Sequence, residues 1–374
     1  MKAQPAAFLR TTLPLGIDMC EAYDSGRYHS IWLPDHMVSF WPDSIWTPEF
    51  TDLALTSPSP HRHLDGMAVA AAAAVLTKNV PLATCVVDTV RRHPSLLAQS
   101  ALTISHLSKG RFILGLGSGE LENTVPYGFD FDKPVGRLEE AIKVIKLLWH
   151  SDGPVDFEGN FFHLEHARLD TEFYDGKAPP IWLGAAGPRM LKICGTHADG
   201  WWPAGSYTPE DYAAKLKVIM DAGDAAGRDM SHFVPAITQI CLIGDESEIA
   251  EMIEKPMVKS IILMLTANDL KQFGYRHPMG EDWRGIMDFD PVKLSRDKII
   301  RFCAEVDTQA IRDIFPVGSP RAVAAKLKGF ADAGMRVVKF MDYGGMAGAK
   351  FGATSAMKVR EAEDELLLMC RGEA

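Results

Sequence analysis

The stretch VPLATCVVDTVRRHPSLLAQSALTISHLSKGRFILGLG, residues 80–117, decides the fold class of this chain. It opens with VPLATCVV (80–87) and closes with GRFILGLG (110–117), two short apolar runs typical of strands buried on both faces. Between them, HPSLLAQSALTISHL (93–107) carries apolar residues at helical spacing, at Leu96, Leu97, Ala101, Ile104 and Leu107. A strand, a helix and a second strand in this order predict a βαβ unit with parallel strands.

The same alternation continues along the chain. Helical patterns separate further strand-like runs, which are HSIWL (29–33), PPIWLG (179–184), FVPAITQICLIG (233–244) and MRVVKFMDY (335–343). About eight strands over this length favour a closed (β/α)8 TIM barrel, with a doubly wound open parallel sheet as the alternative. We therefore expect an α/β protein whose strands carry their functional residues at one end of the sheet.

Residues 255–315 interrupt this alternation. The stretch is aromatic and punctuated by glycine and proline, as in FGYRHPMGEDWRGIMDFD (273–290). We expect one barrel domain over residues 1–374, with 255–315 as an insertion late in the barrel and a candidate lid.

Composition excludes several classes of partner. A net charge of −10 argues against nucleic acid or an anionic membrane surface, although a small phosphorylated ligand remains possible. The six cysteines form no C-x-x-C pair, so neither a disulfide framework nor a zinc ribbon is expected. Without a signal-peptide core or an apolar run of membrane-spanning length, we expect a cytoplasmic protein. The histidines of HRH (61–63) and HLEH (163–166) lack further ligands at suitable spacing, so they are interpreted as surface or turn residues and no metal site is expected.

Four predicted strand ends carry unusual residues, and in a barrel they would meet at one mouth. They are Asp35-His36, TCVVD (84–88), GLGSGELEN (115–123) and GAAGPRM (184–190). Asp35-His36 follows Pro34, so it is either a catalytic carboxylate beside an imidazole or ordinary turn chemistry.

The GAAGPRM segment predicts a phosphate-binding turn. Gly187 permits an unusual backbone angle and close approach of a ligand, and Pro188 suits the first turn of the following helix. Free amides at that helix start, with Arg189 nearby, form an anion site. A plain Gly-Pro turn is the alternative.

Glu120 follows a buried strand and two glycines. Such a carboxylate could have a raised pKa and donate a proton, or it could begin a solvated helix together with Glu122. The glycines do not have dinucleotide-fold spacing and suit a lip against which a flat ring lies. The pair Trp201-Trp202 could lie in the barrel core or form a ring-stacking wall, and we expect one of the two in the core.

These stretches together resemble the luciferase-like barrel superfamily, in the branch that uses the deazaflavin coenzyme F420 (8-hydroxy-5-deazaflavin). The resemblance rests on WLPDH, the segment ATCVVDTVRRHPSLLAQSALTISHLSKGRFILGLGSGE, RLEEAIKVIKLLW, IWLGAAGPRMLKICG with ADGWW, and GSPRAVAAKL, in the family's order. The stretches GELENTVPYGFDFDKPVGRLEEA, AAGPRML and HPMGEDWRG are similar to the mycobacterial phthiodiolone ketoreductase group.

The resemblance implies an oxidoreductase that moves a hydride between C5 of the deazaflavin and a ketone, an alcohol or an activated alkene. In it, His36 is the base or oxyanion stabiliser, Glu120 is the carboxylic acid, and Asp35 hydrogen-bonds the deazaflavin region. Relatives are commonly homodimers. The aromatic insertion suggests an apolar or extended small-molecule substrate, and the lysines that grip sugar phosphate in the family's glucose-6-phosphate dehydrogenase have no counterparts.

The resemblance also implies which residues hold the cofactor. Cys85-Val86 would form a non-proline cis peptide that props the ring from behind. The remaining cofactor-binding positions are Asp35, Ser118, Gly119, Asn123, Ala185, Ala186 and Gly187. Phe40 and Trp41 stand near the place of a family tryptophan, and with Trp202 they are the expected substrate pocket.

Two other functions remain open. An FMN-dependent luciferase-like monooxygenase would bind FMN through Asp35, His36 and the Gly187 turn, and Glu120 would be incidental. A barrel that binds a partner without catalysis is the second alternative, and the joint presence of Asp35, His36 and Glu120 argues against it.

Overall fold

The computed structural model describes residues 3–373. Its main sheet runs in the order β1-β13-β11-β10-β9-β6-β4-β3-β2, and every neighbouring pair in it is parallel. The strands are β1 (Gln4–Pro5), β2 (Ala7–Phe8), β3 (Ile31–Leu33), β4 (Leu82–Thr84), β6 (Phe112–Gly117), β9 (Ile181–Leu183), β10 (Gly200–Trp201), β11 (Val234–Ile243) and β13 (Val337–Asp342). Two short strands join them, β5 (Val87–Asp88) beside β6 and β12 (Val317–Gly318) beside β11.

The N-terminal segment closes the sheet. β1 pairs with β13, and β2, which begins one residue after β1 ends, pairs with β3. One extended segment is therefore hydrogen-bonded to the strands at both edges of the sheet and joins these edges into a barrel. The predicted (β/α)8 TIM barrel is therefore confirmed, and the doubly wound open sheet is wrong.

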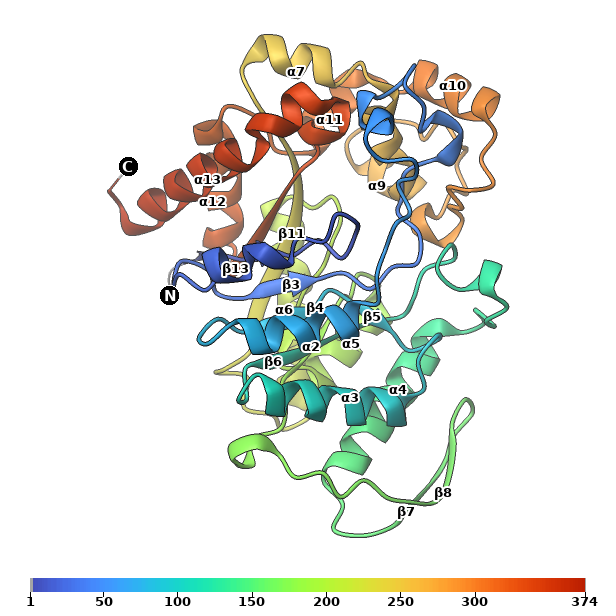
Figure 1. Ribbon diagram of the computed structural model, residues 1–374, viewed down its shortest axis with the longest axis vertical. Helices are drawn as coiled ribbons and strands as arrows, with labels where there is room; N and C mark the ends of the chain where they lie inside the picture. The colour runs from blue at the N-terminus through green and yellow to red at the C-terminus, as the bar shows by residue number, and fades with distance from the viewer. Residues whose placement is uncertain (1–2, 374) are drawn as a thin grey trace.

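Helices cover the outside of the barrel, as Figure 1 shows for α2 and α3 on the near side. They are α1 (Cys20–Tyr23), α2 (Gly66–Leu76), α3 (Pro94–Leu107), α4 (Pro134–Trp149), α5 (Pro188–His197), α6 (Pro209–Ala225), α12 (Pro320–Asp332) and α13 (Ala349–Arg371). Their buried faces and the outward-facing strand residues form the main hydrophobic core. No helix of residues 3–373 is long and apolar enough to cross a membrane.

Tryptophans fill the barrel interior. The Trp32 and Trp202 rings stack with centroids 3.6 Å apart, and Trp182 lies 5.1 Å from Trp32. Small residues, Ala6, Ala83 and Ala236, complete this layer. The interior is therefore packed, as expected of a TIM barrel, and a ligand must bind above this layer.

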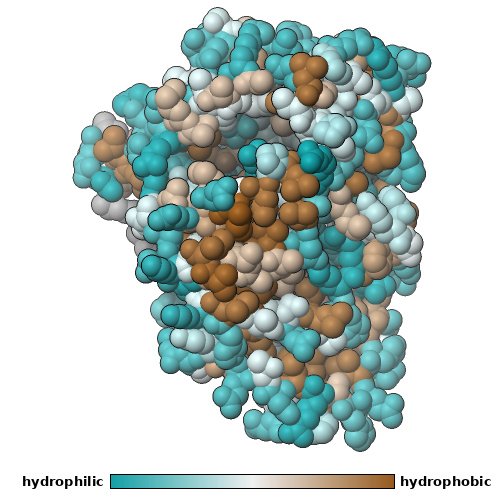
Figure 2. Space-filling model, viewed as in Figure 1, coloured by the Kyte–Doolittle hydropathy of each residue, from teal (hydrophilic) through white to brown (hydrophobic). Residues whose placement is uncertain are grey.

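A layer of helices lies over one end of the barrel, at the top of Figure 1. It consists of α7 (Glu246–Met252), α8 (Pro256–Lys259), α9 (Ala267–Gln272), α10 (Arg296–Glu305) and α11 (Thr308–Ile314). Its own hydrophobic core also includes Ile45, Leu242 and Tyr343, which follow or end strands β3, β11 and β13. The layer therefore covers the carboxyl ends of the strands, and Figure 2 shows a hollow between it and the barrel.

The expected insertion at 255–315 falls within this layer, which consists mainly of short helices between β11 and β12. A small antiparallel hairpin, β7 (Val155–Glu158) with β8 (His163–Ala167), projects at the opposite end of the molecule (Figure 1). It carries the HLEH segment, whose histidines are exposed as predicted.

One threonine maintains the hydrogen bonding of the barrel wall where β4 leaves β6. Ladder pairing ends at Ala83 and Ile113 and resumes only at Val87 and Leu116. In between, the Thr84 hydroxyl donates to the Gly115 carbonyl and accepts from the Gly115 N–H, both at 2.9 Å. All these groups are buried, so a side chain satisfies backbone groups that the ladder does not reach.

We expect Thr84→Val to lower the free energy of unfolding by at least about 2 kcal/mol, because it leaves two buried backbone groups unpaired at about 1–3 kcal/mol each. Thr84→Ser keeps the hydroxyl and should lose only about 1 kcal/mol for the methyl group. Denaturant unfolding of the three proteins measures both changes. Equal losses in the two variants would contradict this account of the wall.

Candidate active site

The four strand ends chosen from the sequence lie next to one another. β3, β4, β6 and β9 are consecutive in the sheet, so the segments that follow them leave the same edge side by side. His36 Nδ1 lies 3.2 Å from Glu120 Oε2. The Val86 side chain is packed so closely on Gly117 that a Cβ there would lie 2.6 Å from Val86 Cγ2. The segments around residues 35, 85 and 120 therefore meet at the mouth, and the segment at 185–187 begins beside them.

Asp35 is a buried anchor. Its carboxylate accepts hydrogen bonds from Arg91 Nη2 at 3.0 Å, from Arg92 Nη2 at 2.9 Å and from the Gly66 N–H at 3.0 Å. The last bond ties the start of α2 to the end of β3. Both carboxylate oxygens are thus engaged by the protein, which favours a positioning role over the catalytic and cofactor-binding roles predicted for this side chain.

Asn123 fixes the position of His36 and Glu120. Its Oδ1 accepts from the N–H groups of Met37 and Val38 at 2.7 and 3.0 Å, and this sets the direction of the amide. Its Nδ2 lies 3.0 Å from Glu120 Oε2 and 3.2 Å from Glu122 Oε1. The two amide hydrogens suit the two carboxyl groups, so Asn123 holds the His36–Glu120 pair through its side chain.

This network assigns the imidazole hydrogens. With both Asn123 hydrogens used, the Nδ1–H of His36 donates to Glu120. The other ring nitrogen, Nε2, has no hydrogen-bond partner among the described residues. A carboxylate on one nitrogen and a free second nitrogen is the arrangement of a general acid or base.

The protonated carboxylic acid of the site is Glu122, for which the sequence predicted only a place in a solvated helix start. Its residue is 1% exposed, and Oε2 has no partner. Burial and the negative charge of Glu120 raise the pKa of Glu122 to about 10. Burial alone would also raise the pKa of Glu120, but the His36 charge and hydrogen bonds from His36 and Asn123 lower it overall. The prediction of a raised pKa for Glu120 is therefore wrong, and the carboxyl group with the raised pKa is that of Glu122.

His61 and His63 also lie at the site, so their interpretation as surface or turn residues is wrong. Ser39 contacts both rings, through its N–H to His61 Nδ1 at 3.0 Å and its hydroxyl to His63 Nε2 at 2.8 Å. Burial, followed by the charge of His36, lowers the pKa of His63 to about 3. The sequence held only an indirect indication of this position. The loop between β3 and α2 begins at Asp35 and ends at Gly66, whose N–H bonds Asp35, so the last residues of the loop lie beside His36.

The segments expected to hold a ring and a phosphate have suitable features. The peptide bond between Cys85 and Val86 is cis, as the resemblance implied. Ser118 and Gly119 follow β6 next to it, and Gly119 has a positive φ of 91°. Together these residues form a wall and a lip at the mouth of the barrel.

The helix start after β9 is open to an anion. α5 begins at Pro188, and no side chain caps its first amides. Ala185 is buried, while Ala186 and Gly187 are exposed. Gly187 has an ordinary φ of −77°, so the unusual backbone angle that glycine permits is not used there, and the space around its Cα is open. Arg189 pairs with Glu139 at 2.9 Å, so the amides rather than this guanidinium group are free to receive an anion.

Two of the three expected pocket aromatics face the helical layer. The Phe40 ring lies edge-on to His36 with centroids 5.1 Å apart, and Trp41 lies 4.9 Å from Tyr343. Trp202 instead stacks inside the barrel and donates from Nε1 to Thr238 Oγ1 at 2.8 Å. Phe40 and Trp41 therefore lie above the mouth of the barrel, whereas Trp202 lies below it in the interior layer, apart from the other two residues of the expected substrate pocket.

The same side chains include groups that can act as metal ligands. His36, Glu120 and Glu122 offer donor atoms within 4.8 Å of one another. Asn123 Nδ2 lies 3.0 to 3.2 Å from all three side chains, so an amide N–H group takes the central position of the cluster. The donor set suits shared protons better than a cation.

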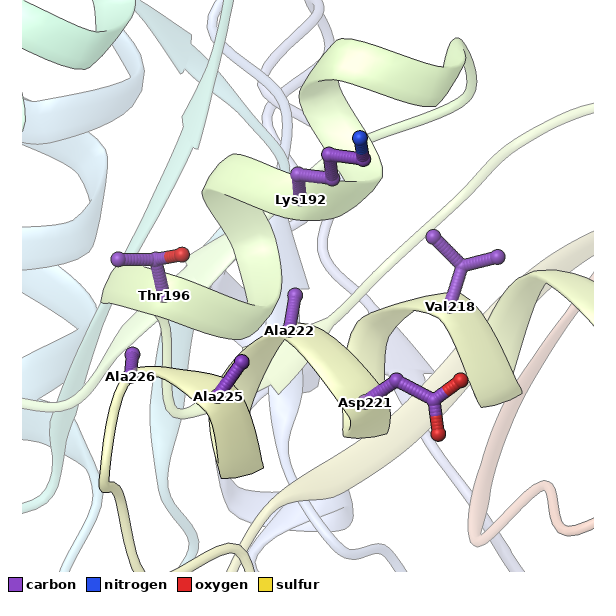
Figure 3. A pocket seen from close by; sticks show the side chains of 7 residues that line it. All are labelled: Lys192, Thr196, Val218, Asp221, Ala222, Ala225 and Ala226. Atoms are coloured by element: carbon purple, nitrogen blue, oxygen red, sulfur yellow. The ribbon is translucent and has the colours of Figure 1, made fainter.

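A separate groove of about 540 Å³ lies on the outside of the barrel between α5 and α6 (Figure 3). Lys192 and Thr196 line it from α5, and Val218, Asp221 and Ala222 line it from α6. These residues face away from the strand ends that meet at the mouth, so the groove is not part of the candidate active site.

Comparisons with known proteins agree with this architecture. A family model described as luciferase-like monooxygenase matches residues 15–336. The phthiodiolone/phenolphthiodiolone dimycocerosates ketoreductase of Mycobacterium tuberculosis is 34% identical over 339 residues, 88% of this chain and 87% of that protein. The F420-dependent glucose-6-phosphate dehydrogenase of Kineococcus radiotolerans is 30% identical over 311 residues, 80% of this chain and 82% of that one.

A solved structure shares the fold over nearly the full length. An F420-dependent secondary alcohol dehydrogenase, in complex with an F420-acetone adduct, superposes with a TM-score of 0.74 at 20% identity. The match covers 98% of this chain and 99% of that chain. At this identity the likeness supports the barrel and not the chemistry.

We expect Glu122→Gln to be more stable than the unaltered protein, by an amount that grows with pH. Folded Glu122 keeps its proton up to a pKa of about 10, while an unfolded glutamate loses it near 4.5. Between these values the folded state binds more protons, so the free energy of unfolding falls as the pH rises, by at most about 1.4 kcal/mol per pH unit. The Gln variant lacks this loss.

Denaturant unfolding at about pH 5, 7 and 9 measures the difference. Glu165→Gln, at an exposed position of β8, is the control and should show no such trend. A constant difference across this range would mean that Glu122 is ionised in the folded protein.

Proposed function

Because the chain belongs to the luciferase-like monooxygenase family, we propose that it is an oxidoreductase that uses coenzyme F420 on a ketone, the corresponding alcohol or an activated alkene. The observation that carries the proposal is the His36–Glu120 pair, which holds a free imidazole nitrogen at the mouth of the barrel. The F420-dependent dehydrogenase and the ketoreductase among its relatives support this choice.

The residues at the mouth fit the parts of such a cofactor. The wall at Cys85-Val86 and the lip at Ser118 and Gly119 would support the flat ring. The uncapped amides at Ala186 and Gly187 would bind the phosphate of its tail. When bound, the deazaflavin supplies two-electron hydride exchange at its C5.

His36 would handle the proton of the reaction. Its Nε2 can donate to the carbonyl oxygen as that oxygen gains charge, or accept the proton of an alcohol in the reverse direction. Glu120 holds the ring through Nδ1 and stabilises the imidazolium form, so the free nitrogen keeps a fixed direction. Asp35 and Asn123 then act by position, since each holds backbone or side-chain groups around His36.

The substrate would be apolar or extended. Phe40 and Trp41 lie between His36 and the core of the helical layer, so the space above the ring is bordered by aromatic side chains. We propose that residues 255–315 act as the lid of a single barrel domain and set the choice of substrate.

An FMN-dependent monooxygenase is the second candidate, favoured by the description of the matching family. It would use the same wall and phosphate turn, and it would not need the Glu120 carboxylate. A barrel that only binds a partner is disfavoured, because it would have no use for the buried hydrogen-bond network around His36.

Reconstitution with F420 and with FMN tests the proposal. We expect the protein to bind F420 more tightly than FMN, and His36→Ala to keep that affinity while turnover of ketone substrates falls at least roughly tenfold. His163→Ala, on the distant hairpin, should change neither. Fluorescence titration and anaerobic turnover provide the two readouts.

Micromolar binding of FMN with none of F420 would replace this function by the monooxygenase. Unchanged turnover in His36→Ala, with F420 bound, would keep the cofactor and remove His36 from the reaction.

We also propose that the protein is a homodimer. α2 is apolar on every side and still leaves Val75 64% exposed, and on α3 Leu96 is 59% exposed. Figure 2 shows apolar side chains gathered on the face where Figure 1 draws these two helices. A helix that is apolar all round is usually buried, so a second copy is the partner we expect.

The double change Val75→Glu and Leu96→Glu should convert the dimer into a folded monomer, because it places two charges in the apolar face. Sedimentation velocity measures the mass. Ile300→Glu, an exposed apolar position on α10, is the control and should leave the dimer intact. A wild-type monomer, or a dimer that survives the double change, would contradict this interface.

A further inference from the structure

Lys339 places a cation inside the barrel. On β13, Val337 belongs to the interior layer and Val338 to the outer core, so Lys339 points inward again. Its residue is only 2% exposed, and its Nζ lies 3.6 Å from the centre of the Phe8 ring. It is two residues nearer than Val337 to the carboxyl end of the strand, which puts it above the tryptophan layer and below the mouth.

This lysine has no anionic partner among residues 3–373. It takes part in no ion pair or hydrogen bond, and burial lowers its pKa against a smaller, opposing effect of the Cys85 thiol. By comparison, the largely buried guanidinium group of Arg91 forms ion pairs with both Asp35 and Asp88. A buried cation without a partner is costly, and only a ring face compensates for it here.

The surroundings of Lys339 belong to the candidate cofactor site. Cys85, whose thiol its charge influences, is the first residue of the cis peptide that forms the wall. Thr238, its neighbour in the β11 register, holds Trp202 in the floor. The ammonium group therefore lies where the floor meets the wall, at the deep end of the space proposed for the ring.

We propose that Lys339 binds the anionic pyrimidine end of the reduced cofactor. This inference rests on the proposed function. When a deazaflavin is reduced, negative charge collects on its N1–C2=O end, and a buried ammonium group beside that end stabilises the reduced form more than the oxidised form. Phe8 would hold the ammonium group in place until the anion arrives.

Affinities for the two cofactor forms test this role without turnover. We expect Lys339→Met to weaken binding of reduced F420 at least about tenfold and binding of oxidised F420 by less than about threefold, as expected for the loss of one charge-assisted contact. Lys326→Met, at an exposed lysine of α12 whose Nζ donates to the Phe315 carbonyl, is the control and should change neither value. Anaerobic titrations followed by absorbance and fluorescence give both dissociation constants.

A second variant guards against a folding defect. Lys339→Gln keeps a polar side chain without the charge and should show the same selective loss, while circular dichroism confirms the fold of both variants. Reduced FMN carries its charge at the same end, so the titrations are repeated with that cofactor.

The outcomes separate the two proposals. Equal weakening of both forms, or no change, would overturn the role of Lys339 and leave the F420 function standing. Binding of FMN alone, still with a selective loss of the reduced form in Lys339→Met, would overturn the F420 function and keep Lys339 as the anion site. A wild-type protein that binds neither cofactor would overturn both.

Discussion

The structure depends on the rule that every buried backbone group must find a partner. In this barrel wall the rule is met by the Thr84 hydroxyl, which takes both backbone groups of Gly115 when the ladder between β4 and β6 is interrupted. Because the Thr84 hydroxyl replaces the missing ladder hydrogen bonds, the backbone at Cys85 and Val86 can leave the barrel wall and lie at the mouth. The wall of the candidate cofactor site therefore lies at the point of the barrel where the Thr84 side chain replaces the hydrogen bonds of a neighbouring strand.

Three carboxyl groups at the mouth are chemically alike and have different states. Asp35 is held between two guanidinium groups and an amide, so its contacts are structural. Glu120 is paired with an imidazole, and Glu122 is buried beside Glu120 and stays protonated. Neighbours rather than residue type decide which carboxyl group holds the backbone, which one pairs with the imidazole and which one stays neutral.

Local patterns predicted the elements and the barrel well, because buried parallel strands and their helices have clear sequence signatures. They also located Asp35, His36 and Glu120, since strand ends converge in this fold. They could not show that Glu122 is the protonated acid, or that His63 reaches His36, because both depend on contacts made by a long loop. The stacked position of Trp202 could not be predicted either, because a single sequence does not distinguish aromatic side chains that point into the barrel from those that point out of it.

The N-terminal segment bonds both to β3, its near neighbour in sequence, and to β13, the last strand of the barrel. Ribosomes deliver a chain from its N-terminus, so β1 emerges long before the strand that covers its other edge. Until β13 appears, the growing sheet has two exposed edges of the kind that invite aggregation. Final closure must therefore wait for nearly the whole polypeptide, and nascent-chain chaperones have a long interval in which to act.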